Sequence, residues 1–482
     1  MPLRTVEQYR ESLRDGRAVY FRGQRVADVT SHPVIGVAVD HASIDYAMAD
    51  DPAYRSLAVV QDESGQPSSR YYHLPRSTDD LLQRSALIEQ ATALGNTLVV
   101  LIKEIGSDAL FALHRIAAQL DSQRATAYLP RVQRFYEHCR TNDLALAVAQ
   151  TDVKGDRSKG PAAQEQPDAY LRIVDRTAAG LVVRGAKCHT SVATNANELI
   201  VLPTRAMSEA DADYAVAFAI PMNTPGLTLL ASSFGAEGLA ERSAFEYPIT
   251  ARHKMMETTT IFDDVVVPWE RVFLAGEWQY AGPLALAFVE FHRFTAISYK
   301  LPLVDALVGA AQLLAQYNGI SRAAHVRDKL ISLIAYAETL RGLTQHGAAR
   351  GQAQELGLVV PDPLTVNMAK YHFAHHYHEH VAEVQDIAGG LLVTGPGLED
   401  LESEEVGPYL TKYFVGGGGV SARARLQAFN FVKELTSSEY GGYQEVLAIH
   451  AEGSLEAEKL MIARSYDSAR TLNLVRTMAG LA

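Results

Sequence analysis

Apolar residues recur every three or four positions in two long stretches of the first 140 residues, LLQRSALIEQATALGNTLVVLIKEI and DALFALHRIAAQLDSQ. This spacing is typical of helices that bury one face. Earlier in the chain, two apolar runs in AVYFRGQRVADVT flank Gly23, which predicts a small β-hairpin. We therefore expect residues 1–140 to form a helical domain with a short hairpin near its start.

The pattern changes over residues 141–275, where short β-rich runs are separated by turns of Gly, Pro, Asn and Asp. The runs are YLRIVDRT, GLVVRGAKC, ELIVLPTRA, AVAFAIPM, LTLLAS and TTTIFDDVVVPW. Such segments predict a β-domain of the sandwich or barrel type. Over residues 276–482 the helical spacing returns, as in FHRFTAISYKLPLVDALVGAAQLLAQY. The order helix, β, helix predicts an α+β protein with three domains.

The composition is that of a globular protein, because 48% of the 482 residues are hydrophobic and 21% are charged. The formal net charge of −12 offers no basic surface for a phosphate backbone, which argues against nucleic-acid binding. The N-terminus lacks the apolar core of a secretory signal, and no stretch approaches the ~18 uninterrupted apolar residues of a membrane span. We expect a soluble cytoplasmic protein.

The cysteine content limits the chemistry. The chain has two cysteines, Cys139 and Cys188, which cannot build a disulfide framework. By themselves they also cannot supply the usual thiolate set of an iron–sulfur cluster.

Two polar segments are candidate cofactor-binding loops. Residues 150–159, QTDVKGDRSK, combine amide, hydroxyl and cationic groups that suit a flavin with its pyrophosphate, although a solvated turn would look similar. Residues 187–195, KCHTSVATN, follow an apolar strand and could read the edge of a planar heterocycle, or form a simple polar turn. Neither segment is a P-loop, and the chain has no Rossmann glycine fingerprint between a strand and a helix.

Three histidine- or glycine-bearing segments are also candidates. His292, Thr295, Ala296 and Tyr299 fall on one helical face, where an imidazole and a phenol could form a pocket wall, or where the histidine could be an ordinary core residue. His372, His376 and His380 repeat every four residues, which can ligate zinc but is more typical of structural or surface histidines. The segment 385–390, QDIAGG, permits close approach of a ligand or another chain, or ends a helix.

Six segments together resemble the 4-hydroxyphenylacetate 3-hydroxylase superfamily, and within it the branch of the 4-hydroxybutyryl-CoA dehydratases. They are TDVKGDRSK (151–159), VVRGAKCHT (182–190), DDVVVPWERV (263–272), the helix around His292, VQDIAGGLLVTGP (384–396) and IHAEGS (449–454). They span nearly the whole chain in the order of the family.

The resemblance implies an acyl-CoA-dehydrogenase-like fold: a helical N-domain, a β-barrel or sandwich middle domain and a C-terminal four-helix bundle. It also implies a homotetramer that binds FAD between domains and across a subunit interface. The residues that it places at the flavin are Gln150, Thr151, Lys154, Ser158, Lys187, His189 and Thr190. Gln385, Asp386, Gly389 and Gly390 would approach the FAD of a neighbouring subunit.

The chain departs from both branches of the superfamily. The dehydratases hold a four-iron cluster with three cysteines and a histidine; here His292 remains, whereas Val100, Glu104 and Tyr299 stand at the cysteine positions. The active-site tyrosine of the dehydratases is replaced by Ala296, while Glu257, Lys300 and Glu452 are retained. The phenol-binding Arg, Tyr and His of the hydroxylases are replaced by Ile105, Ala109 and Val148.

We therefore expect an FAD-dependent monooxygenase without an iron–sulfur cluster or other metal site, which hydroxylates a small organic substrate with reduced flavin from a separate reductase. His292 would handle the proton, Tyr299 and Lys300 would fix a substrate oxygen, and Glu257 would lie nearby. The alternative is a redox-neutral acyl-CoA dehydratase or double-bond isomerase, in which His292 removes an α-proton assisted by Lys300 or Glu452. A third interpretation is a scaffold protein that has lost its activity.

Overall fold

The computed structural model of the chain describes residues 3–62, 65–235 and 243–481. Helices dominate its first part, as the apolar spacing predicts, but the stretch expected to be helical over 81–105 leaves the helix after Leu94 and becomes helical again only at Glu104. They are α1 (Val6–Ser12), α2 (Ile35–Ala42), α3 (Ile44–Asp50), α4 (Arg55–Ala58), α5 (Thr78–Leu94), α6 (Glu104–Gln123) and α7 (Leu129–Thr141). A small antiparallel pair, β3 (Val59–Gln61) and β4 (Pro67–Ser69), lies between α4 and α5.

The predicted hairpin at Gly23 is present, as β1 (Val19–Phe21) and β2 (Gln24–Arg25). Gly23 has a φ of +78°, a left-handed conformation that glycine adopts without strain. The hairpin does not stay with the helices, because β1 also pairs in parallel with a strand of the middle region, in the register Val19 to Leu229. The N-terminal segment is thereby part of the β-sheet.

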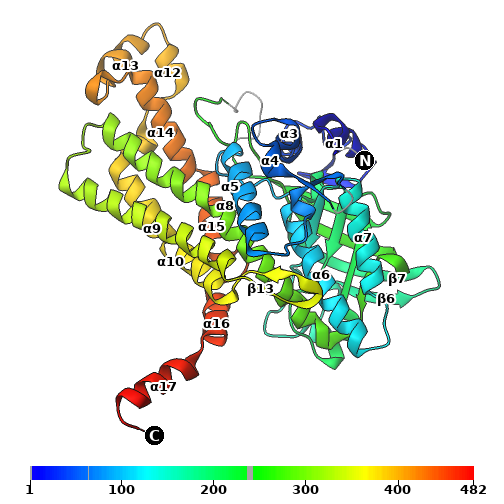
Figure 1. The fold of residues 1–482 in the computed structure, drawn as a ribbon. Helices are drawn as coiled ribbons and strands as arrows, with labels where there is room; N and C mark the ends of the chain where they lie inside the picture. Colours follow the sequence, from blue (N-terminus) through cyan, green and yellow to red (C-terminus); the bar gives the residue numbers. More distant parts are fainter. Residues whose placement is uncertain (1–2, 63–64, 236–242, 482) are drawn as a thin grey trace.

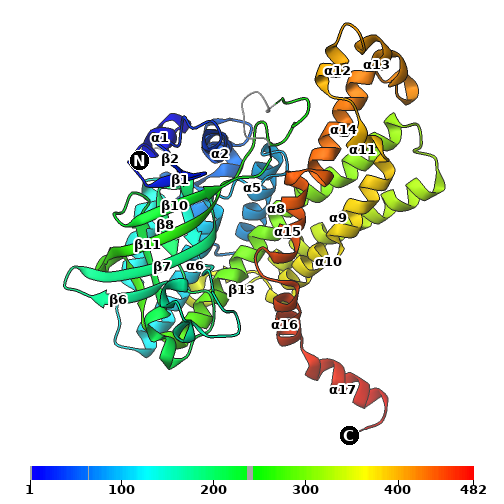
Figure 2. The same ribbon diagram turned by 180° about the vertical axis from the view of Figure 1, so that it is seen from behind.

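The middle region contains two sheets. Its strands are β5 (Leu146–Ala149), β6 (Arg172–Arg176), β7 (Gly180–Ser191), β8 (Glu198–Val201), β9 (Val216–Pro221), β10 (Leu227–Ser232), β11 (Glu257–Pro268) and β12 (Val272–Ala275). One sheet has the order β2-β1-β10-β11-β7-β6, and Figure 2 labels its strands. The other sheet has the order β12-β9-β8-β5. Phe218 of β9 and Phe262 of β11 meet edge to face, with 6.0 Å between ring centroids, so the two sheets share a core.

Long helices return after β12. They are α8 (Ala281–Tyr317), α9 (Ala324–Ala349), α10 (Pro363–Ala388), α11 (Leu391–Thr394), α12 (Leu398–Glu402), α13 (Gly407–Tyr413), α14 (Ala422–Ser437), α15 (Glu439–His450), α16 (Leu455–Ser465) and α17 (Ser468–Met478). A short pair, β13 (Gln352–Ala353) and β14 (Val359–Val360), joins α9 to α10. Helices α8, α9, α10 and α14 form the bundle, from which α12 and α13 project at one end and α17 at the other (Figure 1).

Polar residues mark the starts of several helices. The Ser77 side chain accepts a hydrogen bond from the backbone N–H of Asp80, and the Asp80 carboxylate accepts one from the backbone N–H of Ser77. This reciprocal pair is a capping box at the start of α5. Asp362 caps α10, where Pro363 occupies the first turn. Ser421 caps α14. These local signals mark where the helices begin.

Helix α8 is apolar enough that its composition alone would allow it to cross a membrane. In the fold, 56% of its most apolar 18-residue stretch is buried. It packs against α5 and α6 on one side and against α9 and α10 on the other. Its hydrophobicity is therefore that of a core helix that joins the N-terminal helices to the bundle.

The sequence of helices, two sheets and helices confirms the predicted α+β class. The secondary structure changes between Thr141 and Leu146 and again between Ala275 and Ala281, close to the predicted limits of 1–140, 141–275 and 276–482. That these three parts are separate domains stays a prediction.

Helix α6 approaches β5 closely at Gly106. A Cβ atom at this position would lie 2.1 Å from Cβ of Leu146 and 2.6 Å from its Cδ1. The backbone N–H of Leu146 also donates to the carbonyl of Ile102, at 2.8 Å. Glycine thus allows the first turn of α6 to lie directly on the strand.

We expect Gly106→Ala to lower the free energy of unfolding by about 1–3 kcal/mol or more, because the added methyl group forces α6 away from β5. The matched control is Gly309→Ala in α8, where a Cβ would meet nothing within 4 Å and the helix gains about 1 kcal/mol. Denaturant titrations of both variants make the comparison. Equal effects of the two substitutions would contradict the close approach.

Candidate active site

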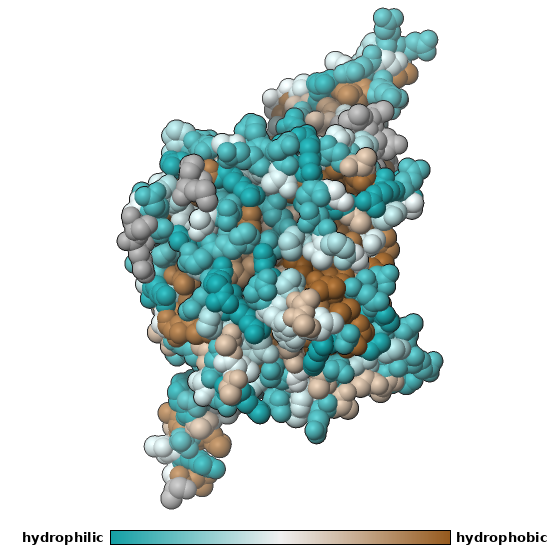
Figure 3. All heavy atoms as spheres, turned by 90° about the vertical axis from the view of Figure 1, so that its right-hand side faces the viewer, coloured by the Kyte–Doolittle hydropathy of each residue, from teal (hydrophilic) through white to brown (hydrophobic). Residues whose placement is uncertain are grey.

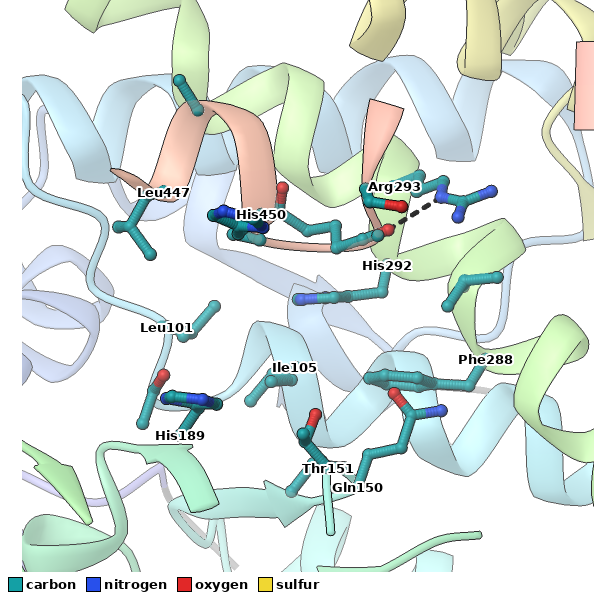
Figure 4. A pocket seen from close by; sticks show the side chains of 18 of the residues that line it. Leu101, Ile105, Gln150, Thr151, His189, Phe288, His292, Arg293, Leu447 and His450 are labelled. Carbon is teal, nitrogen blue, oxygen red and sulfur yellow. Dashed lines mark hydrogen bonds between the residues drawn. The ribbon is translucent and has the colours of Figure 1, made fainter. Parts of the chain in front are cut away.

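A cavity of about 1000 Å³ lies where the β region meets the C-terminal helices. Ligand cavities commonly measure about 300–1,000 Å³, so this one has room for a large cofactor and a small substrate. Its walls come from the segment after β5, the end of β7, the first turn of α6, the N-terminal half of α8 and the turn between α15 and α16. Segments far apart in the sequence converge here (Figure 4).

The lining combines apolar, charged and hydrogen-bonding side chains. Apolar members include Leu101, Ile105, Val148, Met255, Phe288, Val289, Leu303, Phe373 and Leu447. Charged members are Lys154, Arg157, Arg205, Arg293, Lys300, Arg464, Glu257 and Glu452. Because cationic groups outnumber carboxylates, the cavity favours an anionic ligand.

His292 reaches into this cavity from α8, facing Gln150, Thr151 and His189 across the space (Figure 4). Its ring stacks on Phe288, with 5.0 Å between centroids and 13° between planes. Its Nδ1 lies 3.1 Å from Oδ2 of Asp108. The ring is therefore held from one side and on one edge, with the opposite edge toward the cavity.

Asp108 is a functional candidate that the sequence interpretation missed. It is fully buried on α6, and its Oδ1 accepts hydrogen bonds from Arg84 of α5, at 2.7 Å, and from Thr295 of α8, at 3.1 Å. One signal was available, because Asp108 shares one face of α6 with Glu104 and Arg115 among apolar residues, and carboxylates are rarely fully buried without a partner. The Thr295 side chain thus turns to Asp108 and not into the cavity.

Glu452 lies at the centre of a second buried cluster. Its carboxylate accepts a hydrogen bond from the phenol of Tyr299 and another from Nζ of Lys300, at 2.9 Å, while Nζ of Lys370 lies 3.7 Å away. Burial alone would raise the pKa of Glu452, but the two ammonium groups lower it to about 2. Burial lowers the pKa of Lys300 to about 8, against the opposing effect of Glu452. The cluster therefore places an ionised carboxylate beside an ammonium group that loses its proton at a lower pH than that of an exposed lysine.

The turn that carries Glu452 has an unusual backbone. Glu452 has a φ of +56° and Gly453 a φ of +118°. Nε of Arg293 donates to the carbonyl of Glu452 at 2.8 Å, as the dashed line in Figure 4 marks. A Cβ at Gly453 would lie 2.4 Å from the guanidinium of Arg293. Residues held in this left-handed region cost free energy and often belong to functional sites.

Glu257, at the start of β11, forms a third polar group in the wall. Ser191 and Tyr443 each donate to its carboxylate at 3.0 Å. Removal from water raises the pKa of Glu257 to about 7, although both hydrogen bonds oppose the shift. Near neutral pH this carboxyl group is poised between its protonated and ionised forms.

The predicted flavin residues divide into two groups. Gln150, Thr151, Lys154 and His189 line the cavity. Lys187 does not: its ammonium group is buried in an ion pair with Asp152, at 2.9 Å, and donates to the carbonyls of Gln150 and Leu202. Lys187 therefore holds residues 150–152 in place without lining the cavity itself. A direct contact of Lys187 with a ligand stays a prediction.

Two further predicted residues lie off the lining. Ser158 is exposed and donates to Asp156 at 2.7 Å. Thr190 is fully buried at the end of β7, and its Oγ1 has no hydrogen-bond partner among the described residues. An unpaired buried hydroxyl beside the cavity is the type of group that a bound ligand or a water molecule satisfies.

The segment 385–390 ends α10 away from the cavity of its own chain. Gln385 donates to the carbonyl of Thr436 at 2.8 Å, and Asp386 pairs with Lys329 at 2.5 Å. Gly389 has a φ of +75° and ends the helix, and with Gly390 it turns the chain into α11. The helix-ending interpretation fits this geometry, and an approach to the FAD of a neighbouring subunit stays a prediction.

Of the repeating histidines of α10, His376 pairs with Glu379 at 3.4 Å and His380 with Glu383 at 2.8 Å, whereas Nε2 of His372 lies 3.3 Å from the carbonyl of Tyr336. Within residues 3–62, 65–235 and 243–481, no group of three or more His, Cys, Asp or Glu side chains could hold a metal ion. Cys139 is buried in α7 and Cys188 lies in β7, and neither lines the cavity. The donor set therefore does not fit a four-iron cluster, which is usually held by cysteine thiolates.

The polar and cationic side chains of the cavity wall do fit a flavin. Gln150, Thr151 and Thr204 offer the hydrogen-bonding groups that a heterocycle requires, and Arg157 and Arg205 add positive charge for a pyrophosphate. The sequence interpretation included Arg157 within the loop 150–159 but missed Thr204 and Arg205, which follow β8 and which no local motif connects to that loop.

Comparisons with known proteins agree with this description. The 4-hydroxyphenylacetate 3-hydroxylase N-terminal model matches residues 5–274, and the C-terminal model matches residues 281–480. The chain is 33% identical to 4-hydroxybutyryl-CoA dehydratase/vinylacetyl-CoA-Δ-isomerase of Clostridium aminobutyricum, over 99% of this chain and 100% of the relative. It is 29% identical to the 4-hydroxyphenylacetate 3-monooxygenase oxygenase component of Thermus thermophilus, over 92% and 90% of the two chains.

Solved structures give the same result. An oxygen-tolerant archaeal 4-hydroxybutyryl-CoA dehydratase from N. maritimus superimposes with a TM-score of 0.93 at 30% identity, over 100% of this chain and 96% of the other. An oxygenase component of 4-hydroxyphenylacetate 3-monooxygenase complexed with FAD gives 0.91 at 25% identity, over 98% of each chain. The predicted acyl-CoA-dehydrogenase-like fold is thus confirmed. Matched by both family models over nearly its whole length, the chain is an enzyme of the 4-hydroxyphenylacetate 3-hydroxylase family.

Proposed function

We propose that the protein is the oxygenase component of a two-component flavin monooxygenase, which hydroxylates a small organic substrate. The observation that carries the proposal is the set of groups around His292: a buried carboxylate holds its Nδ1, Tyr299 turns to Glu452, and among the described residues no thiol lines the cavity. A flavin cavity of this type lacks the usual ligands of a cluster but keeps a polar edge for FAD. The relative solved with FAD supports the cofactor.

When bound, reduced FAD supplies the two electrons that let one atom of oxygen enter the substrate and the other leave as water. Gln150, Thr151, Lys154 and His189 would hold it, with Arg157 and Arg205 near its phosphates. A separate flavin reductase would provide the reduced form. The apolar residues of the lining would exclude bulk water from the reacting groups.

The protein side chains would bind and orient the substrate and handle its proton. In this proposal His292 accepts a proton from the substrate at Nε2, and Tyr299 and Lys300 fix a substrate oxygen. Glu452 keeps the phenol and the ammonium group in place, as their hydrogen bonds to its carboxylate indicate. Glu257 would be a neutral hydrogen-bond donor below its pKa of about 7.

The second candidate function is redox-neutral isomerisation of an acyl-CoA or a related acid. The observation in its favour is that His292, Lys300, Glu452 and Glu257 all line one cavity, and the chain is 33% identical to a dehydratase and Δ-isomerase. In this reaction His292 would remove an α-proton and Lys300 would assist. Oxygen consumption separates the two functions, because an isomerase uses none.

We also propose that the protein acts in the cytoplasm as a homotetramer. Helix α17 has no buried residue and projects from the body of the chain, with exposed apolar side chains (Figure 3). These are Leu472, Leu474, Val475 and Met478, which is 79% exposed. Apolar side chains gathered on a projecting helix are typical of a surface that another chain covers.

The first experiment supplies the full-length protein with FAD, a flavin reductase and NADH, and measures oxygen consumption and hydroxylated product with a panel of phenols and other electron-rich acids. We expect substrate-dependent product in the wild type and a loss of at least ~100-fold in His292→Gln, because proton transfer contributes about 10²–10⁴-fold. His378→Gln, on the exposed side of α10, is the matched control and should keep full activity. Turnover of vinylacetyl-CoA without oxygen, and no product from the panel, would favour the isomerase.

Glu257→Gln tests the raised pKa of this carboxyl group. In the wild type, the folded state keeps the proton up to a pH of about 7, whereas the unfolded carboxyl loses it near 4.5. The free energy of unfolding therefore falls as the pH rises between these values, and we expect Glu257→Gln to flatten this part of the curve. Urea titrations across this pH range measure it, with the exposed Glu404→Gln expected to follow the wild type.

Two charge-matched pairs of substitutions test the role of α17. We expect Leu474→Lys with Met478→Lys to reduce the oligomer size in analytical ultracentrifugation, because an ammonium group is costly to bury in an apolar interface. Asn473→Lys with Thr477→Lys adds the same charge on a neighbouring face of the helix and should have a smaller effect. A wild-type monomer would contradict the proposal directly.

A further inference from the structure

We propose that Asp108 is a positioning residue that, together with Arg84, fixes one tautomer of His292 so that its Nε2 stays free as the proton acceptor. This inference rests on the proposed proton-handling role of His292. It explains why a family histidine without the thiolates of a cluster is still held in a defined orientation. Asp108 and Arg84 reach no ligand themselves, since neither side chain lines the cavity.

The hydrogen bonds of Asp108 determine which ring nitrogen carries the proton. Oδ1 accepts from the guanidinium of Arg84 at 2.7 Å and from the hydroxyl of Thr295 at 3.1 Å, so this oxygen serves as an acceptor. The Arg84 and Asp108 side chains are both buried and form an ion pair, which keeps the carboxylate charged. A charged carboxylate cannot donate, and therefore Nδ1 of His292, 3.1 Å from Oδ2, must carry the hydrogen.

The other ring nitrogen is then an acceptor by necessity. In a neutral imidazole one nitrogen is a donor and the other an acceptor. Among the contacts of the described residues, Nε2 of His292 has no hydrogen-bond partner, and the ring lies in the wall of the cavity (Figure 4). The lone pair of Nε2 is available to a substrate hydroxyl. It would take up that proton to give an imidazolium paired with Asp108, and would return it to the product or to water.

The ring also has little freedom to turn. Phe288, one helical turn earlier on α8, stacks on it. Arg84 is anchored in addition by the carbonyls of Tyr71 and Glu104, each at 3.0 Å, so the ion pair cannot move with the histidine. The orientation of His292 is thus set by α5 and α6, which belong to the N-terminal helices, and not by its own helix alone.

The tautomer can be observed without any reaction. We would label the full-length, FAD-saturated protein with ¹⁵N-histidine and record two-bond ¹H–¹⁵N spectra under mildly alkaline conditions, with His292→Gln to assign the signals. We expect the wild type to show the Nδ1–H form. In Asp108→Asn, Arg84 still donates to the amide oxygen and the amide N–H faces Nδ1, so we expect the Nε2–H form. A wild-type Nε2–H form, or an unchanged tautomer in Asp108→Asn, would overturn the proposal.

Two further variants keep the test decisive. Asp108→Asn leaves the Arg84 charge buried without its partner and could prevent folding. Arg84→Met with Asp108→Leu replaces the whole ion pair by apolar side chains, which is often neutral for stability, and should also abolish the fixed Nδ1–H form. Thr295→Val removes one donor to Asp108 but keeps the ion pair, and it should retain the wild-type tautomer. A change of tautomer in Thr295→Val, or none in the double variant, would contradict the assignment.

The rate of carbethoxylation of His292 by diethyl pyrocarbonate, followed by peptide mass spectrometry, gives a second readout. This reagent attacks the unprotonated nitrogen, so Asp108→Asn should lower the rate at Nε2. If a substrate that the protein hydroxylates is found, Asp108→Asn should lower kcat by about 10²–10⁴-fold with KM little changed. If Asp108→Asn changes the tautomer but the wild type has no oxygenase activity, the proposed function is refuted and the positioning role stands. If the wild type is active and Asp108→Asn leaves the tautomer unchanged, the positioning role alone is refuted.

Discussion

The structure depends on one buried carboxylate, that of Asp108, which connects three helices. Arg84 on α5, Asp108 on α6 and Thr295 and His292 on α8 meet in a region that is closed to solvent. Removing one partner of a buried ion pair strongly destabilises a protein, because the other charge stays buried without compensation. The helices that carry these partners must therefore assemble together. Because α8 also forms the core of the bundle, the same contacts that fix the imidazole fix the N-terminal helices against the C-terminal ones.

The second cluster also pairs charges in the interior, but with cationic groups in excess. Two ammonium groups, those of Lys300 and Lys370, surround the carboxylate of Glu452, and Arg293 holds the backbone of the same turn. The turn lies between α15 and α16, the last helices before the projecting α17. Charge pairing in the interior therefore determines how the C-terminal segment leaves the body of the protein. The cavity lies between these two clusters. The first contributes His292 to the groups proposed to act on the substrate, and the second contributes Tyr299 and Lys300.

The class of the fold could be predicted because it follows from local patterns: helical spacing, capping residues and short β-runs repeat along the chain. The pairing of β1 with β10 could not, since hairpin signals describe neighbours in sequence and these strands are far apart. The site shows the same division. His292 and Tyr299 could be found from helical spacing, whereas Asp108 contacts residues 24 and 184 positions away. Lys187 could be singled out within the polar segment 187–195, but it lies in strand β7 and not in a loop, and its orientation toward Asp152 depends on the packing of the sheet.

The parallel pairing of β1 with β10 has a consequence for the order of assembly in the cell. Val19 of β1 lies opposite Leu229 of β10, so the ribosome must complete about 210 further residues before the partner strand exists. At about 5–20 residues per second this interval is roughly 10–40 s. During that time the N-terminal hairpin has an unpaired edge, while the strand that will cover it is still being synthesised. The first strands of this chain can therefore join the larger sheet only after β10 has left the ribosome, although they are the first to be synthesised.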